Sequence, residues 1–284
     1  MKRLVCALLS LMIILLLLTS CSKNEEFVVC PANAGDVSIV SFNVAAPWGS
    51  LTNNTLSASR VKRFALYMNA VKPDSIGTQE MNSIWMEKLG ELMPDYDSYG
   101  VIRGGDDNEK KSEMNSIFWL KDKYNCVDKG TFWLSTTPDT ESKYDGAGCN
   151  RVCSYVVLKD KESNMQYIHM NTHLDNASEQ ARSFGADVIM DRIAQLEKQY
   201  PNIPIVLSGD FNEYLSDPAC QQILTKLNTK AVSGNTYHDW GSINEGEPID
   251  FIFTTGEVVE SSMLNDVTNG LVSDHYGVWE IINL

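Results

Sequence analysis

The sequence has few positive charges for its length. Its 23 lysine and arginine residues face 37 aspartate and glutamate residues, and the formal net charge is -14. A protein that holds nucleic acid on a broad basic surface needs lysine and arginine on the phosphates, so this composition disfavours that class. Catalysis on phosphate groups stays open, because a bound divalent cation can supply local positive charge.

Internal repeats, low-complexity tracts and clustered zinc ligands are also missing. A chain of 284 residues without repeats fits one large domain with a substantial core. The cysteines outside the N-terminal segment are Cys30, Cys126, Cys149, Cys153 and Cys220. None has the additional close cysteine or histidine ligands of a zinc site, so we interpret them as structural. Their odd number allows one or two disulfides in an oxidising compartment and leaves at least one free thiol.

The first residues carry the pattern of an export signal. Lys2 and Arg3 precede an apolar run, Leu4–Leu18, which is too short for a stable transmembrane helix. Small residues then lead to Cys21. This pattern predicts that residues 1–20 are a signal peptide and lie outside the folded protein.

The end of that segment, Leu18-Thr-Ser-Cys21, resembles the lipobox of bacterial lipoproteins, in which the cysteine is lipidated and becomes the new N terminus. The resemblance implies an exported protein that Cys21 anchors to the bacterial cell envelope, at the outer membrane, on its periplasmic or its surface face. Residues 21–36 then serve as a tether. A plain secretory signal with a chance cysteine is the alternative.

Strand-like segments in the first half end on polar residues. The hydrophobic run Val37–Val44 has Asn43 near its end, and the short strand Ser75–Glu80 ends on a carboxylate. A helix opened by Ser57 or Ser59 lies between them. The alternation of strands and helices predicts an α/β layer with a buried sheet.

Two further helices are predicted from their apolar spacing. The residues that the first should turn inward are Ile84, Trp85, Leu89 and Leu92. The second spans Ser178–Gln199, and its apolar stripe consists of Val188, Ile189, Ile193 and Leu196.

The chain between residues 114 and 173 is typical of a meander of antiparallel strands. The strands expected there are Met114–Trp119, Gly130–Ser135, Arg151–Leu158 and Met165–His173. Two polar loops that contain glycine, Arg103–Asn108 and Thr136–Asn150, are expected at the rim that sets substrate choice. His169, inside the last strand, is expected to be a satisfied core residue.

The segment Ile205–Asn212 is an apolar run that stops on Gly209 and delivers two polar side chains. A buried strand is expected here, with Asp210 and Asn212 on one face and Phe211 on the other, because side chains alternate in an extended chain. Taken alone, these residues also fit an ordinary turn.

Asn43 and Glu80 together suit a hard cation. Mg²⁺ takes oxygen ligands and is commonly held by one or two carboxylates and water. Either residue alone also has an ordinary explanation, as a turn residue or as a carboxylate at a helix start. The pair therefore indicates a metal site only in company with other polar residues.

The later part of the chain supplies histidines with nearby carboxylates. Asp175 follows His173 on the same strand face, Asp250 stands near the start of a strand, and Ser273-Asp274-His275 precedes the closing strand. A histidine paired with a carboxylate can act as a base, an acid or a charge stabiliser.

Six motifs in this order resemble the endonuclease/exonuclease/phosphatase superfamily, the fold of DNase I, neutral sphingomyelinases and inositol polyphosphate 5-phosphatases. They are Asn43, Gln79-Glu80, Asn171-Thr-His173-Leu, Gly209-Asp210-Phe-Asn212, Ile249-Asp250-Phe-Ile-Phe and Ser273-Asp274-His275. Each motif is weak alone, but six in order are hard to obtain by chance. Phe132-Trp-Leu-Ser135 also resembles the secreted bacterial branch, although Tyr144-Asp145 stands where that branch often has Trp-Asp.

The resemblance implies an α/β fold, a four-layer sandwich in which two packed, mixed and mostly antiparallel β-sheets are flanked by helices. The domain would cover residues 37–284, and we expect a monomer whose two halves meet at one cleft. Mg²⁺, with Mn²⁺ or Ca²⁺ as alternatives, would be held by Glu80 with Asn43 and joined by Asp274.

The resemblance also implies roles for the other residues. Asp210, oriented with Asn212, would position or deprotonate the attacking water. His275, paired with Asp250, is the competing base, or else it stabilises the pentacoordinate phosphorus. These two assignments of the base remain open at this stage.

The predicted function is hydrolysis of a phosphomonoester or phosphodiester by water, which needs carboxylates, a metal and histidines to converge. His173 would contact the scissile phosphate, with help from Arg151. A phosphatase or phosphodiesterase is favoured over a nuclease, because no lysine and arginine cluster marks a strand-binding groove. The alternatives are an extracytoplasmic DNA or RNA endonuclease of the same fold and a surface lipoprotein that binds without catalysis.

Overall fold

The computed structural model describes residues 35–46, 54–106, 112–265 and 267–284. The chain divides into two units, Met1–Cys30 and Pro31–Leu284, and all described residues belong to the second. The predicted signal peptide, Cys21 and most of the predicted tether lie outside the described residues. No described helix is long and apolar enough to cross a membrane.

One sheet has six strands in the order β10-β11-β1-β2-β4-β3. Their bounds are Asp36–Asn43 for β1, Ser75–Met81 for β2, Tyr96–Tyr99 for β3, Met114–Leu120 for β4, Glu257–Leu264 for β10 and Gly277–Asn283 for β11. The β1 and β2 strands run parallel, and the other neighbouring pairs are antiparallel.

The second sheet has five strands in the order β5-β6-β7-β8-β9. Their bounds are Tyr124–Trp133 for β5, Val152–Asp160 for β6, Gln166–His173 for β7, Ile205–Asp210 for β8 and Asp250–Thr254 for β9. Only β7 and β8 are parallel here. The predicted meander is confirmed for β5, β6 and β7 but is wrong for β4, which pairs with β2 and β3 in the other sheet.

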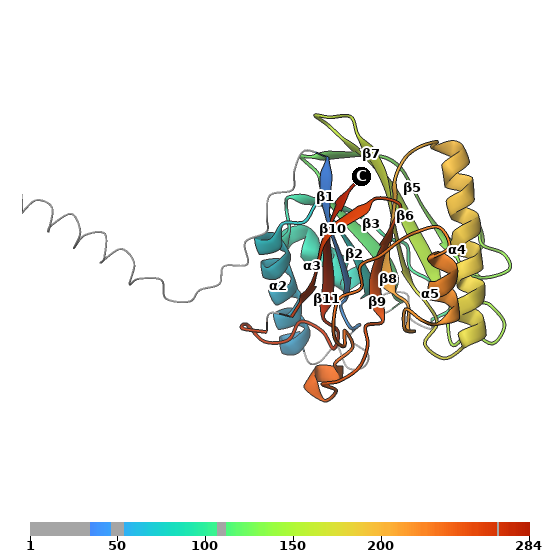
Figure 1. Cartoon of the computed structure of the whole chain (residues 1–284). Coiled ribbons are helices and arrows are strands. Elements are labelled where there is room, and N and C mark those ends of the chain that lie inside the picture. Colours follow the sequence, from blue (N-terminus) through green and yellow to red (C-terminus); the bar gives the residue numbers. More distant parts are fainter. Residues whose placement is uncertain (1–34, 47–53, 107–111, 266) are drawn as a thin grey trace, which may run out of the picture. The chain divides into compact units, whose positions relative to one another are not determined.

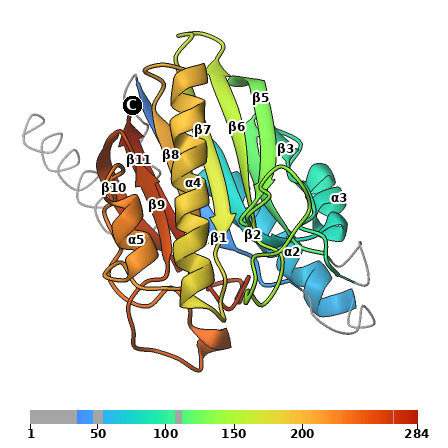
Figure 2. The same ribbon diagram turned by 90° about the vertical axis from the view of Figure 1, so that its right-hand side faces the viewer.

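Helices cover both outer faces of the paired sheets. The helices are α2 (Asn54–Val71), α3 (Ser83–Leu92), α4 (Glu179–Gln199) and α5 (Pro218–Ile223), with a short 3-10 turn at Asp239–Gly241. Figure 1 shows α2 and α3 on one side and α4 and α5 on the other, and Figure 2 shows α4 lying along the five-stranded sheet. The predicted four-layer α/β sandwich is confirmed.

The start of α3 corrects one prediction. The side chain of Asn82 caps the helix by accepting a hydrogen bond of 3.0 Å from the Trp85 amide. Trp85 and Leu89, four residues apart on one helix face, are buried, whereas Ile84 is 37% exposed. The expectation that Ile84 points inward is wrong, because a residue next to Trp85 is turned about 100° around the helix axis.

The hydrophobic core lies between the two sheets and between the second sheet and α4 and α5. Near the ends of β2 and β8 the layer between the sheets becomes polar. Gln79 Nε2 donates to Asn171 Oδ1 at 2.7 Å, and Asn171 Nδ2 donates to the Thr78 carbonyl at 2.8 Å. Gly77 permits this close approach, because a Cβ there would stand 2.1 Å from Ser208 Oγ.

The cysteines in the described residues carry free thiols. They are Cys126, Cys149, Cys153 and Cys220. No disulfide therefore forms among these four, and Cys30 lies outside the described residues.

His169 is a satisfied core residue, as predicted. Its Nδ1 lies 2.8 Å from Ser75 Oγ and its Nε2 lies 2.9 Å from Ser208 Oγ, so the ring joins β2 to β8. Burial lowers the pKa of His169 to about 3. The ring is therefore neutral in the folded protein at neutral pH.

This burial predicts an acid-sensitive stability. Because the pKa of His169 is lower in the folded than in the unfolded chain, the unfolded chain binds more protons as the pH falls from about 6.5 towards 3. The free energy of unfolding should therefore fall by up to about 1.36 kcal/mol per pH unit from this group. Urea titrations of the wild type and His169→Gln between pH 7 and 4 should show a shallower slope in the variant. Equal slopes would contradict this role of His169.

Candidate active site

Polar residues from both sheets meet at one cleft. The pairing of β7, β8 and β9 sets His173 opposite Asp210 and Asp210 opposite Asp250. The cleft has a volume of about 500 Å³. The predicted site residues that line it are Glu80, Arg151, His173, Asp210, Asn212, Asp274 and His275. The other two, Asn43 and Asp250, are buried and contact members of this group.

Asn43 connects the two sheets at the cleft. Its Nδ2 donates to Glu80 Oε1 at 3.0 Å and to Asp210 Oδ2 at 2.9 Å, and its Oδ1 accepts from the Ala45 amide at 2.9 Å. The opposite amide orientation would set its oxygen against two carboxylates, so these neighbours fix the side chain. In this arrangement Asn43 orients Glu80 and Asp210 through its nitrogen.

Glu80 has a backbone conformation that few side chains adopt. Its φ is +59°, and the β2–β4 register shifts between Thr78 and Met81. This irregularity lies where the Glu80 side chain lines the cleft. Its second oxygen, Oε2, accepts from the Ala46 amide at 2.8 Å.

Asp210 lies between two histidines. His173 Nε2 is 3.4 Å and His275 Nε2 is 3.7 Å from Asp210 Oδ2, while the Asn212 amide donates to Asp210 Oδ1 at 2.9 Å. Burial raises the pKa of Asp210, and the Asp250 carboxylate raises it further, to about 7. Asp210 is thus able to accept a proton near neutral pH.

The two histidines differ in charge. Burial alone would lower the pKa of His275, but Asp250, whose Oδ2 lies 2.9 Å from Nδ1, and the carboxylates of Asp210 and Asp274 raise it to about 10. Burial lowers the pKa of His173, and Arg151 and Arg103 lower it further. At neutral pH, Asp210 therefore has a protonated histidine on one side and a neutral one on the other.

The donor set fits a metal ion. Asp210, Asp250 and His275 place their possible ligand atoms within 4.8 Å of one another, so this group could hold one. Glu80 and Asp274 line the same cleft and offer the oxygen ligands that hard cations take. Within the described part of the chain, Asp250 Oδ1 is buried without a hydrogen-bond partner.

Asp175 does not join His173 as the sequence suggested. No hydrogen bond connects the two among the described residues, because the chain turns after β7. The Asp175 carboxylate instead accepts from the amides of Gly148, Ala177 and Ser178, each at 3.0 Å. His173 takes Asp210 as its carboxylate neighbour.

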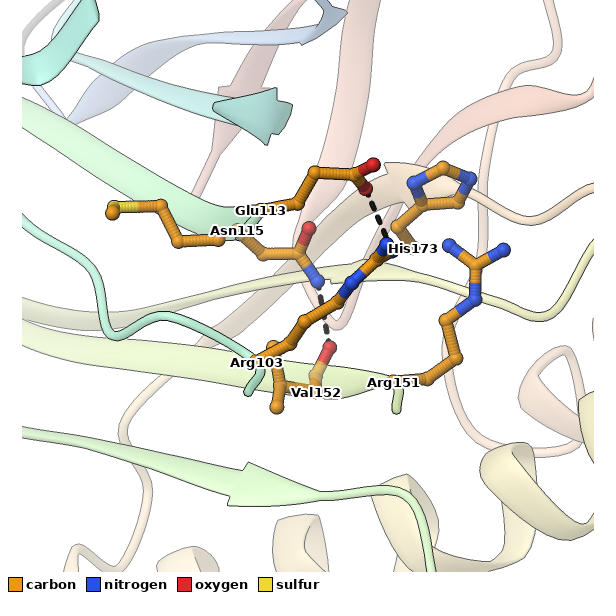
Figure 3. A pocket seen from close by; sticks show the side chains of 7 residues that line it. Arg103, Glu113, Asn115, Arg151, Val152 and His173 are labelled. Atoms are coloured by element: carbon orange, nitrogen blue, oxygen red, sulfur yellow. Dashed lines mark hydrogen bonds and ion pairs between the residues drawn. The ribbon is translucent and has the colours of Figure 1, made fainter. Parts of the chain in front are cut away.

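The sequence motifs did not identify Arg103 as a site residue, although its loop was expected at the cleft rim. That expectation is confirmed for both loops, because Arg103 from the first and Gly148 and Cys149 from the second line the cleft. Figure 3 shows Arg103 and Arg151 beside His173, with Arg103 Nη1 donating to Glu113 Oε2 at 2.7 Å.

The sequence motifs did not identify Arg60 either, because an arginine in an amphipathic helix usually lies on the solvated face. Its guanidinium lies over the rings of Trp85 and Trp240, 5.2 and 5.0 Å from their centres. It donates to the carbonyls of Ala45 and Val272, both at 2.6 Å. Arg60 thereby ties the segment after Asn43 to the segment before Asp274.

Comparison with known protein families identifies the family to which this chain belongs. Residues 40–275 match the model described as the Endonuclease/Exonuclease/phosphatase family. The chain belongs to this family. The resemblance seen in the sequence motifs is thereby confirmed, and the chain is a member of a superfamily of hydrolases that act on phosphoester bonds. No curated protein matches the sequence.

Solved structures of family members are similar over most of the chain. The endonuclease/exonuclease/phosphatase of Bacteroides vulgatus has 29% identity and a TM-score of 0.79, and covers 88% of this chain and 99% of its own. A family protein of Bacteroides thetaiotaomicron has 27% identity and a TM-score of 0.78, with 87% and 94% covered. The mannosyl-6-phosphatase of Bacteroides thetaiotaomicron has 26% identity and a TM-score of 0.80, with 87% and 100% covered.

The charge on His275 is directly measurable. In protein kept free of metal by a chelator, NMR titration of the histidine rings should show His275 still protonated at pH 8. Asp250→Asn should lower the pKa of His275 by roughly one to three units, because it removes the nearest negative charge. An unchanged pKa of His275 in this variant would show that its pairing with Asp250 does not cause the raised pKa.

Proposed function

We propose that this protein is a phosphoesterase that depends on a divalent cation, with Mg²⁺ as the ion, and that it hydrolyses a small phosphomonoester such as a sugar phosphate. The observation that carries the proposal is the placement of Asp210 between a neutral His173 and a protonated His275, with Asn43 linking it to Glu80. Proton acceptor, cationic donor and metal ligand then share one cleft.

Glu80 and Asp274 would hold the cation, with Asn43 keeping Glu80 in place. We favour this pair over the Asp210, Asp250 and His275 group, because the protonated His275 ring already sits between those two carboxylates. When bound, Mg²⁺ supplies positive charge for the phosphate oxygens and the leaving oxygen.

Within the proposal, Asp210 is the base that takes a proton from the attacking water. Its pKa of about 7 suits that task, whereas His275, with a pKa of about 10, holds its proton at neutral pH. His275 then donates from Nε2 and stabilises the negative charge on the phosphoryl oxygens in the transition state. The neutral His173 contacts a phosphate oxygen without adding charge beside Asp210.

Two observations favour a small hydroxyl-rich substrate over nucleic acid. One similar structure bears the name mannosyl-6-phosphatase. A second cavity, of about 360 Å³, shares Asn212 and Tyr237 with the catalytic cleft and is lined by Tyr214, Glu245 and Glu247. Carboxylates and tyrosines can bind sugar hydroxyls, and the acidic side chains repel a further phosphate. A nuclease of the same fold is the second candidate and a binding lipoprotein without catalysis the third.

The proposal extends to the placement of the protein in the cell. We propose a monomer that is exported and anchored to the bacterial envelope through a lipid on Cys21. The motif Leu18-Thr-Ser-Cys21 supports this part of the proposal.

Single substitutions should separate catalysis from folding. Asp210→Asn removes the base and His275→Ala removes the cationic donor, and each should lower turnover at least about a hundredfold, as expected for roughly 2.7 to 4 kcal/mol of lost transition-state stabilisation. Thermal melting should show that both variants remain folded. Near-normal turnover of either folded variant would refute its assigned role.

The substrate class can be tested with a panel. Phosphate release from sugar phosphates should exceed cleavage of plasmid DNA, RNA, sphingomyelin and inositol phosphates, and EDTA should abolish it until Mg²⁺ is restored. Faster cleavage of plasmid DNA or RNA would favour the nuclease. No product from any substrate with Mg²⁺ present would favour the binding protein.

A further inference from the structure

Positive side chains are rare in the catalytic cleft. Of the described residues that line it, Arg103 and Arg151 are the ones that carry a permanent positive charge. Both side chains are only 7% exposed, which is unusual for arginine on an acidic protein. Burial of this kind needs a charge partner or a ligand.

Arg103 is held firmly from several directions. Its Nη1 donates to Glu113 Oε2 at 2.7 Å, and Glu113 is itself buried. Its carbonyl accepts from Trp133 Nε1 at 2.8 Å and from Asn150 Nδ2 at 3.1 Å. The guanidinium is thus fixed before any substrate arrives, which lowers the entropy lost on binding.

Arg151 lines the same part of the cleft as Arg103. Its Nη2 donates to Asn176 Oδ1 at 3.0 Å, and its Nε lies 3.5 Å from Asp175 Oδ2. Arg103, Arg151, Glu113 and His173 also line a small side cavity of about 10 Å³, room for about one water molecule. Figure 3 shows the two arginines flanking His173 in this place.

We propose that Arg103, together with Arg151, binds the outer oxygens of the scissile phosphate and selects the terminal phosphate of a monoester over a diester. This inference rests on the proposed phosphoesterase function and names the residues that restrict it to phosphomonoesters. A monoester phosphate carries about -1.5 to -2 charges at pH 7, and guanidinium groups bind such oxygens in a bidentate manner.

The size of the side cavity gives the second reason. A diester carries a second organic substituent on one of the oxygens that would face the arginines. A space for about one water molecule accepts a phosphate oxygen but has no room for an ester substituent, so within the side cavity the arginines bind only an unsubstituted oxygen. A diester also carries only one negative charge, so the two guanidinium groups attract it less strongly than a monoester.

The test compares two esters that share a leaving group. We expect the Mg²⁺-loaded wild type to have a higher kcat/KM for p-nitrophenyl phosphate than for bis(p-nitrophenyl) phosphate. Arg103→Gln should lower the value for the monoester about 10- to 100-fold, as expected for a lost charged hydrogen bond, and that for the diester less than about threefold. Equal losses on both esters would overturn the proposal.

Loss of Arg103 leaves Glu113 without its ion pair, so a second variant guards against misfolding. Arg103→Gln/Glu113→Gln removes both charges and keeps hydrogen-bonding groups, and it should show the same selective loss. Arg192→Gln is the matched control, because Arg192 pairs with the exposed Asp139 outside the cleft. The control should behave as the wild type on both esters, and thermal melting should show all variants folded.

A binding measurement separates this inference from the proposed function. Calorimetric titration of the Mg²⁺-loaded protein with inorganic phosphate needs no turnover, so it applies even if neither ester is hydrolysed, which would refute the proposed function alone. The affinity for inorganic phosphate should fall about 10- to 100-fold in Arg103→Gln and the double variant. An unchanged affinity in the folded variants, or no binding by the wild type, would overturn the role of Arg103.

Discussion

The amide group of Asn43 is the contact on which the site depends. It donates to Glu80 in its own sheet and to Asp210 in the other, so one side chain sets the spacing between the two. Two carboxylates this close repel each other unless a donor lies between them. The polar layer around Asn171 and the small Gly77 bring the sheets close enough for that contact. The fold and the site are therefore built by the same close approach.

The division of charge around Asp210 follows from what is buried on each side. The carboxylates around His275 raise its pKa against the effect of burial, whereas burial lowers the pKa of His173 and Arg151 and Arg103 lower it further. The cleft is lined by the carboxylates of Glu80 and Asp274 and by the guanidinium groups of Arg103 and Arg151. In the proposed function, a cation binds these two carboxylates and phosphate oxygens face the guanidinium groups.

Much of this arrangement could be predicted from the sequence, because strand ends are local features. Asn43, Glu80 and Asp210 each lie at the end of a predicted strand, and the family motifs placed them at one cleft. The contacts between them could not be predicted, since they join residues 37 and 167 positions apart. The prediction that β4 lies in the same sheet as β5, β6 and β7 was wrong for the same reason, because its partner strands β2 and β3 are set by contacts distant in sequence. Arg103 gave no signal beyond a polar loop, because its importance comes from burial beside Arg151.

The position of the bound cation distinguishes the two candidate sets of metal ligands. Crystals soaked in Mn²⁺ would show it by anomalous diffraction, because Mn²⁺ takes the same oxygen ligands as Mg²⁺ and scatters strongly. We expect one peak coordinated by Glu80 and Asp274, with Asp210 still bonded to Asn43. A peak coordinated instead by Asp210, Asp250 and His275 would contradict it, because Asp210 and His275 would then be metal ligands and not the base and the cationic donor.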